Sequence, residues 1–286
     1  MKHQLIILSC LFLFGPPLLV AGQQKTAAEI HLDKGLEHYK AGRHREAVEA
    51  YKQAVRIAPE NANIHYNLGR AYYGLEQWNE AIDAYRETLR LKPESVNAQV
   101  SLGMTYHKQG RFNEAIMSYK EALRIKPDMA EAYWNIGLSH HFAKRYKEAV
   151  EAYGEYARVK PSAGTEFQFH HNFGIAFAGL GQFPQAIDAY KRAIAVKPDD
   201  SESHYLVGGA YYGSRRFAEA VNSLSRATEI KPDYVPYELA LGKAYFSLGN
   251  REAALRQHTK LKTLDSEAAN ELVKSWTAKL SSGRPK

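Results

Sequence analysis

The stretch HYNLGRAYYGLEQWNEAIDAYRETLRLKP, residues 65–93, decides the fold. Its apolar residues recur every three or four positions on both sides of a break at residues 77–79. That spacing is typical of amphipathic helices, and the Pro at position 93 follows soon after the last apolar residue, where it ends the second helix. The stretch therefore predicts two helices joined by a short turn.

The same pattern recurs along the chain. The prolines that follow the second helix are 34 residues apart, with one spacing of 37, and they are Pro59, Pro93, Pro127, Pro161, Pro198 and Pro232. A period of this length indicates a solenoid of stacked units, which ends in a capping element with a polar outer side. We expect seven units, at residues 28–61, 62–95, 96–129, 130–163, 167–200, 201–234 and 235–268, and a capping helix over residues 267–280.

The repeated positions resemble the tetratricopeptide repeat. In the second unit they are Leu68, Gly69, Tyr72, Ala81, Tyr85 and Pro93. The resemblance covers residues 28–268 and implies an all-α fold, a right-handed superhelical α-solenoid of about seven helix pairs. The last unit departs from the pattern, because His258 stands where Tyr or Phe is usual and Ser266 stands where Pro is expected.

Composition agrees with one folded, elongated domain. The chain has 286 residues, 45% of them hydrophobic and 24% charged, with a formal net charge of +7. Basic residues recur at the ends of the second helices, as at Arg56 and Arg90, where they complement the negative end of the helix dipole. A nucleic-acid groove would instead need basic residues interleaved with stacking aromatics, so no nucleic acid is expected as a partner.

The N-terminus has the layout of a secretory signal peptide. Lys2 is followed by an uncharged run over residues 5–14, by two prolines, and by small residues before Gly22. Residues 1–22 are expected to be removed, with Ala21 as the alternative cleavage point, so the protein would be secreted or periplasmic. An uncleaved anchor, or lipidation of Cys10, the single Cys, would instead hold it at a membrane facing the periplasm.

The resemblance implies that the first helices line a concave groove for a peptide. Candidate groove residues are Tyr66, Asn67, Arg70, Tyr73, Met104, His107, Trp134, Asn135, His141, Phe142, His171, Asn172, Tyr205 and Tyr212. Aromatic residues and Arg dominate binding energy when they are buried in an interface. Several of these aromatics could instead pack against a neighbouring repeat.

Amides recur at the sixth position of the units, at Asn67, Asn135 and Asn172. This is similar to the asparagine ladder of some tetratricopeptide proteins. A side-chain amide offers a donor and an acceptor, so it can hold a peptide backbone of any sequence. We expect these three residues to hold the backbone of a bound segment and Tyr66, Tyr73, Trp134 and Phe142 to supply apolar anchors.

No catalytic constellation is recognisable. His141 and His171 could approach each other on the concave face, but no carboxylate or Cys stands with them at a ligand spacing, so no metal and no cofactor is expected. We expect a non-enzymatic scaffold or adaptor that binds an extended or helical segment of a partner protein. The alternative is a membrane-tethered envelope assembly factor that acts through its convex or terminal faces.

A three-residue insertion at residues 162–164 interrupts the period between the fourth and fifth units. It predicts a local change in the curvature of the superhelix. The array would then consist of a half that carries the asparagine ladder and a second half with a different docking face.

Overall fold

The protein is an array of helix pairs. The computed structural model describes residues 25–282, which form fifteen α-helices, one short 3-10 helix and no strand. The expected signal peptide and Cys10 lie outside these residues. Within the described part of the chain, no helix is both long enough and apolar enough to span a bilayer.

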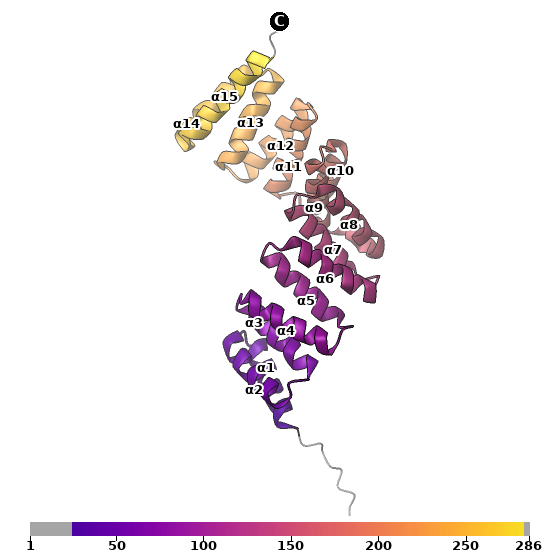
Figure 1. The fold of residues 1–286 in the computed structure, drawn as a ribbon. Coiled ribbons are helices and arrows are strands. Elements are labelled where there is room, and N and C mark those ends of the chain that lie inside the picture. Colours follow the sequence, from indigo (N-terminus) through magenta and orange to yellow (C-terminus); the bar gives the residue numbers. More distant parts are fainter. Residues whose placement is uncertain (1–24, 283–286) are drawn as a thin grey trace, which may run out of the picture.

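Each repeat contributes one first and one second helix. The first helices are α1 (Ala27–Lys40), α3 (Ala62–Gly74), α5 (Val96–Lys108), α7 (Ala130–Phe142), α9 (Phe167–Gly179), α11 (Ser201–Gly213) and α13 (Val235–Leu248). The second helices are α2 (His44–Ile57), α4 (Trp78–Leu91), α6 (Phe112–Ile125), α8 (Tyr146–Val159), α10 (Phe183–Val196), α12 (Phe217–Ile230) and α14 (Arg251–Leu264). A last helix, α15 (Ser266–Ser282), follows them. The predicted all-α solenoid is confirmed, and Figure 1 shows it as one elongated, curved stack.

First helices lie on the inner side of this curve. Neighbouring first helices are in contact in the pairs α1 and α3, α3 and α5, α5 and α7, α9 and α11, and α11 and α13. Within residues 25–282, no pair of second helices from successive repeats is packed as closely. Elements on the inside of a curved stack come closer together, so the first helices line the concave face and the second helices the convex face.

The core of a repeat is a ring packed on a glycine. Tyr85 of α4 is 2% exposed and lies on Gly69 of α3. The same arrangement joins Gly35 to Tyr51, Gly103 to Tyr119, Gly137 to Tyr153, and Gly174 to Tyr190. Without a side chain on the glycine, the two helices approach closely enough for the ring to be enclosed.

The turn within a repeat needs a left-handed residue. Gly42, Gly110, Gly181 and Gly249 have φ between 72° and 89° at this turn. The other three repeats use Glu76, Lys144 and Arg215, with φ between 56° and 61°. A side chain in this conformation costs roughly 1 kcal/mol, so these three turns are held by the packing of the helices they join.

The last helix closes the open end of the stack. In the seventh repeat the side chain of Leu272 from α15, rather than an aromatic ring from α14, meets Gly242. Leu272 is fully buried, and Trp276 stacks on Phe246 with ring centroids 5.1 Å apart. The apolar inner side of α15 thereby replaces the neighbour that the seventh repeat lacks, which explains why His258 is tolerated at the usual aromatic position.

The insertion forms the 3-10 helix η1 (Pro161–Thr165) between α8 and α9. As a result, α8 and α9 are less closely packed than the corresponding helices of the other neighbouring repeats, and α7 and α9 are not in the close contact seen between other first helices. Repeats four and five are therefore packed less closely than the other neighbouring repeats, although Tyr156 of α8 still contacts Phe169 of α9, with ring centroids 5.8 Å apart.

Candidate functional site

A pocket opens on the concave face where three first helices meet. It has a volume of about 160 Å³ and is lined by Tyr39 of α1, Arg70 and Tyr73 of α3, Tyr85 of α4, and Ser101 and Met104 of α5. Three of these residues, Arg70, Tyr73 and Met104, belong to the set predicted from the sequence. The pocket thus joins side chains that are more than thirty residues apart along the chain.

Arg70 is the charged group of the pocket. Its guanidinium carbon lies 4.5 Å from the ring centre of Tyr39 and 5.9 Å from that of Tyr66. Its Nη1 donates to Oδ1 of Asn67 over 3.5 Å. None of the ion pairs within residues 25–277 involves Arg70. The guanidinium is therefore oriented by aromatic rings and keeps hydrogen-bond donors for a carboxylate or a peptide carbonyl.

The floor of the pocket comes from a second helix, which the sequence argument missed. Tyr85 reaches the concave side because Gly69 provides the space, and its ring lies 5.9 Å from that of Tyr66. Burial raises the pKa of Tyr85 and of Tyr73, so both hydroxyls stay neutral at physiological pH. The repeated Gly and Tyr, sixteen residues apart, were the signal that could have identified Tyr85.

Two residues of the predicted asparagine ladder already donate hydrogen bonds to the backbone of their own helices. Nδ2 of Asn67 donates to the carbonyl oxygen of Asn63 over 2.8 Å, and Nδ2 of Asn172 donates to that of Gln168 over 2.9 Å. An amide nitrogen has two hydrogens, so each retains a second donor. Asn135 is half-buried on α7. The hydroxyl of Ser139, one turn later, donates to the backbone carbonyl oxygen of Asn135.

A second aromatic cluster lies on α5, α6 and α7. The ring of Phe142 is 57% exposed and stands 5.3 Å from His107, 5.3 Å from His141 and 6.2 Å from Phe112. Nδ1 of His107 is within 2.9 Å of the hydroxyl of Ser139. Burial lowers the pKa of His107 and of His141, so both rings are neutral at pH 7. Phe142 is the most accessible aromatic of the predicted set.

Trp134 is half-buried rather than fully presented. Its ring lies 5.3 Å from Tyr153 and 5.2 Å from Tyr156, both of which are in α8 and buried. Packing within the fourth repeat therefore accounts for part of its surface.

The remaining predicted residues lie beyond the insertion and do not join the pocket. His171 is buried, with Nδ1 3.2 Å from the hydroxyl of Ser203. Tyr205 stacks on Tyr237 at 4.9 Å, and Tyr212 is half-buried against Phe217 at 5.4 Å. Among the described residues, no three metal-ligating side chains are gathered at a site, and His141 and His171 share no such group.

The recurrent cations at the helix ends pair locally. Arg90, Arg124 and Arg158 each contact a glutamate one turn earlier on the same second helix, at 2.7 to 2.8 Å. These are exposed pairs of the kind that contribute little to stability. Much of the positive charge of the second helices is therefore neutralised by glutamates of the same helices.

Family comparisons agree with this architecture. Tetratricopeptide repeat models match residues 32–96, 130–162 and 171–235, and a TPR repeat model matches residues 103–141. Together these matches cover more than half of the chain, and the protein belongs to the tetratricopeptide repeat family. Such proteins are generally non-catalytic scaffolds for protein interactions. No curated protein matches the sequence.

Several solved structures share the fold. The C-terminal part of a TPR repeat-containing protein from Cytophaga hutchinsonii has a TM-score of 0.72 and 14% identity, over 84% of this chain and 98% of that one. YrrB, a TPR protein with an unusual peptide-binding site, has a TM-score of 0.59 and 19% identity, over 66% and 96%. MamA has a TM-score of 0.56 and 26% identity, over 62% and 95%.

Proposed function

We propose that the protein is a non-enzymatic adaptor that binds an extended segment of a partner protein along its concave face. The observation that carries this proposal is the pocket around Arg70, which spans α1, α3 and α5 and holds a guanidinium without a carboxylate partner among residues 25–277. A half-buried cation of this kind gains most from an anionic or carbonyl group of a ligand.

The chemistry of the face extends the proposal to a segment of several residues. Arg70 would contact an acidic side chain or a backbone carbonyl, and the free amide donors of Asn67 and Asn172 would contact the backbone. The exposed ring of Phe142 would cover an apolar side chain farther along the groove. YrrB, which has the same fold, is a TPR protein with a peptide-binding site, and this likeness supports a peptide as the ligand.

The test is a selection of peptides against the wild-type protein from a random library, followed by affinity measurement. We expect the tightest peptides to contain an acidic residue and to bind Arg70→Gln at least about tenfold more weakly, the loss expected when a charged partner is removed. Arg56→Gln, which makes the same charge change on an exposed second-helix end, should bind them like the wild type. Equal affinities for Arg70→Gln and the wild type, or a failure to select any peptide, would contradict the proposal.

Export is part of the same proposal. The layout of residues 1–22 supports a secreted or periplasmic protein, and retention of these residues or a lipid on Cys10 would tether the adaptor to a membrane. The mass of the mature chain distinguishes the two: removal of residues 1–22 favours release, whereas an intact or lipidated N-terminus favours the tether.

A further inference from the structure

The floor of the concave pocket carries two hydroxyls whose role the adaptor function leaves open. They belong to Tyr85 of α4 and Ser101 of α5, and both residues line the pocket. Burial raises the pKa of Tyr85, whereas Ser101 beside its hydroxyl and the charge of Arg70 lower that pKa. The two hydroxyls and the guanidinium therefore lie near one another.

The equivalent tyrosine of repeat four shows that such a hydroxyl is not accessible in every repeat. Tyr153 also packs on the glycine sixteen residues before it, but its hydroxyl is buried and has no hydrogen-bond partner. Burial alone raises the pKa of Tyr153. Tyr153 thus matches Tyr85 in its packing and differs from it in having no charged pocket beside its hydroxyl.

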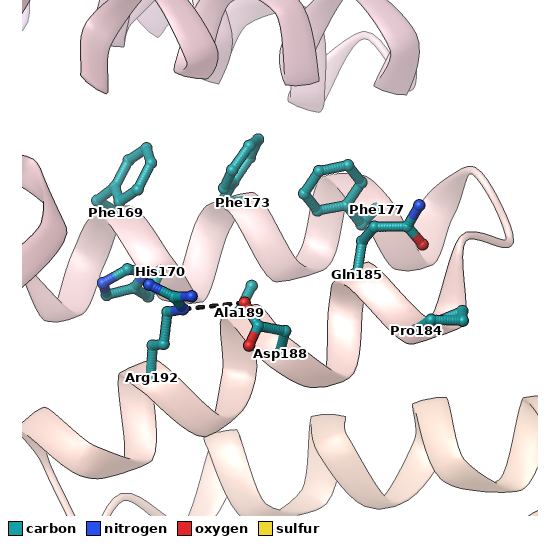
Figure 2. A pocket seen from close by; sticks show the side chains of 9 residues that line it. All are labelled: Phe169, His170, Phe173, Phe177, Pro184, Gln185, Asp188, Ala189 and Arg192. Atoms are coloured by element: carbon teal, nitrogen blue, oxygen red, sulfur yellow. Dashed lines mark hydrogen bonds and ion pairs between the residues drawn. The ribbon is translucent and has the colours of Figure 1, made fainter. Parts of the chain in front are cut away.

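A larger pocket, on repeat five, has both of its charged groups engaged. Its volume is about 520 Å³. Figure 2 shows that one side of it is a row of phenylalanines of α9, namely Phe169, Phe173 and Phe177. Nε of Arg192 donates to Oδ2 of Asp188 over 2.9 Å, as the dashed line in Figure 2 marks. Arg70 of the concave pocket, by contrast, pairs with no carboxylate among residues 25–277.

The polar groups that face the concave pocket are suited to donate hydrogen bonds. The guanidinium of Arg70 is held 4.5 Å from the ring centre of Tyr39. Tyr85 and Ser101 each add a hydroxyl, and none of the described residues that line the pocket is acidic. An ionised carboxylate accepts several hydrogen bonds and donates none, so it suits this set better than an amide or a hydroxyl does.

The depth of the pocket favours a long acidic side chain. Tyr85 belongs to a second helix, behind the layer of first helices, and its ring reaches the concave side through the gap at Gly69. Tyr73 and Met104, both half-buried, stand at the walls. Because glutamate is one methylene longer than aspartate, its carboxylate can pass these walls and reach the floor while its apolar stem contacts them.

We propose that this pocket is a subsite for a glutamate side chain of the bound segment, whose carboxylate accepts hydrogen bonds from Arg70, Tyr85 and Ser101. The inference rests on the proposed adaptor function and names the group that the pocket takes. Arg70 supplies the charge, and the two hydroxyls make glutamate preferred over aspartate and glutamine. A segment that continues along the concave face toward Phe142 presents a side chain at this pocket, and not its C-terminus.

The probes are the acidic peptides selected against the wild-type protein, made with amidated C-termini and with Glu, Asp or Gln at the acidic position. The Glu peptide should bind at least about tenfold more tightly than the Gln peptide, and about threefold or more tightly than the Asp peptide, because hydrogen bonds to a charged group are lost in each case. Equal affinities of the Glu and Asp peptides would overturn the proposal. Equally tight binding of a peptide that has no acidic side chain but a free C-terminus would also overturn it.

Protein variants test the two hydroxyls. Tyr85→Phe keeps the ring on Gly69 and should weaken binding of the Glu peptide about tenfold and that of the Gln peptide little, since the lost hydrogen bond is to a charged acceptor. Ser101→Ala should act in the same direction, by about threefold or more. The matched control is Tyr153→Phe, which makes the same change at a hydroxyl away from the pocket and should leave both affinities unchanged. Thermal denaturation shows that the variants are folded.

The variant Arg70→Gln separates this inference from the adaptor function. If Arg70→Gln loses affinity while Tyr85→Phe and Ser101→Ala bind the Glu peptide like the wild type, binding on the concave face stands and the hydroxyls are not part of the subsite. If all three variants bind like the wild type, or no peptide can be selected, the adaptor function itself is wrong and the glutamate subsite falls with it.

Discussion

The ring of Tyr153 occupies the space that a side chain on Gly137 would need. A Cβ at Gly137 would lie 2.5 Å from Cε1 of Tyr153, and Tyr153 is completely buried. Five repeats share this relationship, so the closest approach between first and second helices depends on a glycine and a ring sixteen residues apart.

Replacement of this glycine should be costly. We expect Gly137→Ala to lower the free energy of unfolding by about 2 kcal/mol, because a buried ring has to shift to admit the methyl group. Gly209→Ala is the control, since Gly209 is exposed within α11 and has open space around it, and it should be stabilising by about 0.5–1 kcal/mol. Chemical denaturation measures both, and a neutral Gly137→Ala would show that the ring is not tightly enclosed.

Variants at Phe142 and Trp134 should distinguish a residue that binds the peptide from one that stabilises the fold. Phe142→Ala is expected to weaken binding of the selected peptides with little change in stability, since its ring is 57% exposed. Trp134→Ala is expected to lower stability by about 2 kcal/mol, because its ring packs on Tyr153 and Tyr156. Thermal denaturation and peptide titration of both variants provide the comparison. Unchanged peptide affinity of the Phe142→Ala variant would show that this ring does not contact the bound peptide.

Gly154 should be a site of stabilisation. Gly154→Ala removes a flexible residue from the middle of α8 and should add roughly 1 kcal/mol, or about 2–4 °C in Tm. Gly154→Lys should add more than Gly154→Ala, although Lys is the weaker helix former, because its stem and ammonium would cover Phe177. If the Lys variant is less stable than the Ala variant, α8 does not lie close enough to Phe177 for this contact.

Two histidines of the aromatic cluster should make stability depend on pH. Burial lowers the pKa of His107 and His141 in the folded protein, so the unfolded chain takes up protons first as the pH falls below about 6.5. Their contribution is present at neutral pH and is lost as the pH falls toward 5, because protons bound by the unfolded state favour unfolding.

The variant His107→Gln with His141→Gln should therefore lose less stability between pH 7.5 and pH 5 than the wild type does. Urea denaturation at several pH values measures the difference. Parallel pH profiles for the two proteins would show that these rings are solvated when protonated.

Local periodicity made much of the fold predictable. The helix pairs and their ends follow from apolar spacing and from Gly and Pro positions, all of which act within a few residues. For the same reason Arg70, Tyr73 and Met104 could be placed on the concave side from their positions in the repeat. Tyr85 was missed because it belongs to a second helix and reaches the pocket only through the gap at Gly69.

The sequence by itself determined the repeat family and the α-solenoid, because a repeated pattern specifies the same helix pair each time. Only the tertiary structure decided that Arg70 lies between Tyr39 and Tyr66, that His171 is buried, and that Phe169 of repeat five packs on Tyr156 of repeat four. These depend on contacts between residues that are far apart in the sequence, where side-chain volumes and the length of the insertion set how closely two helices meet.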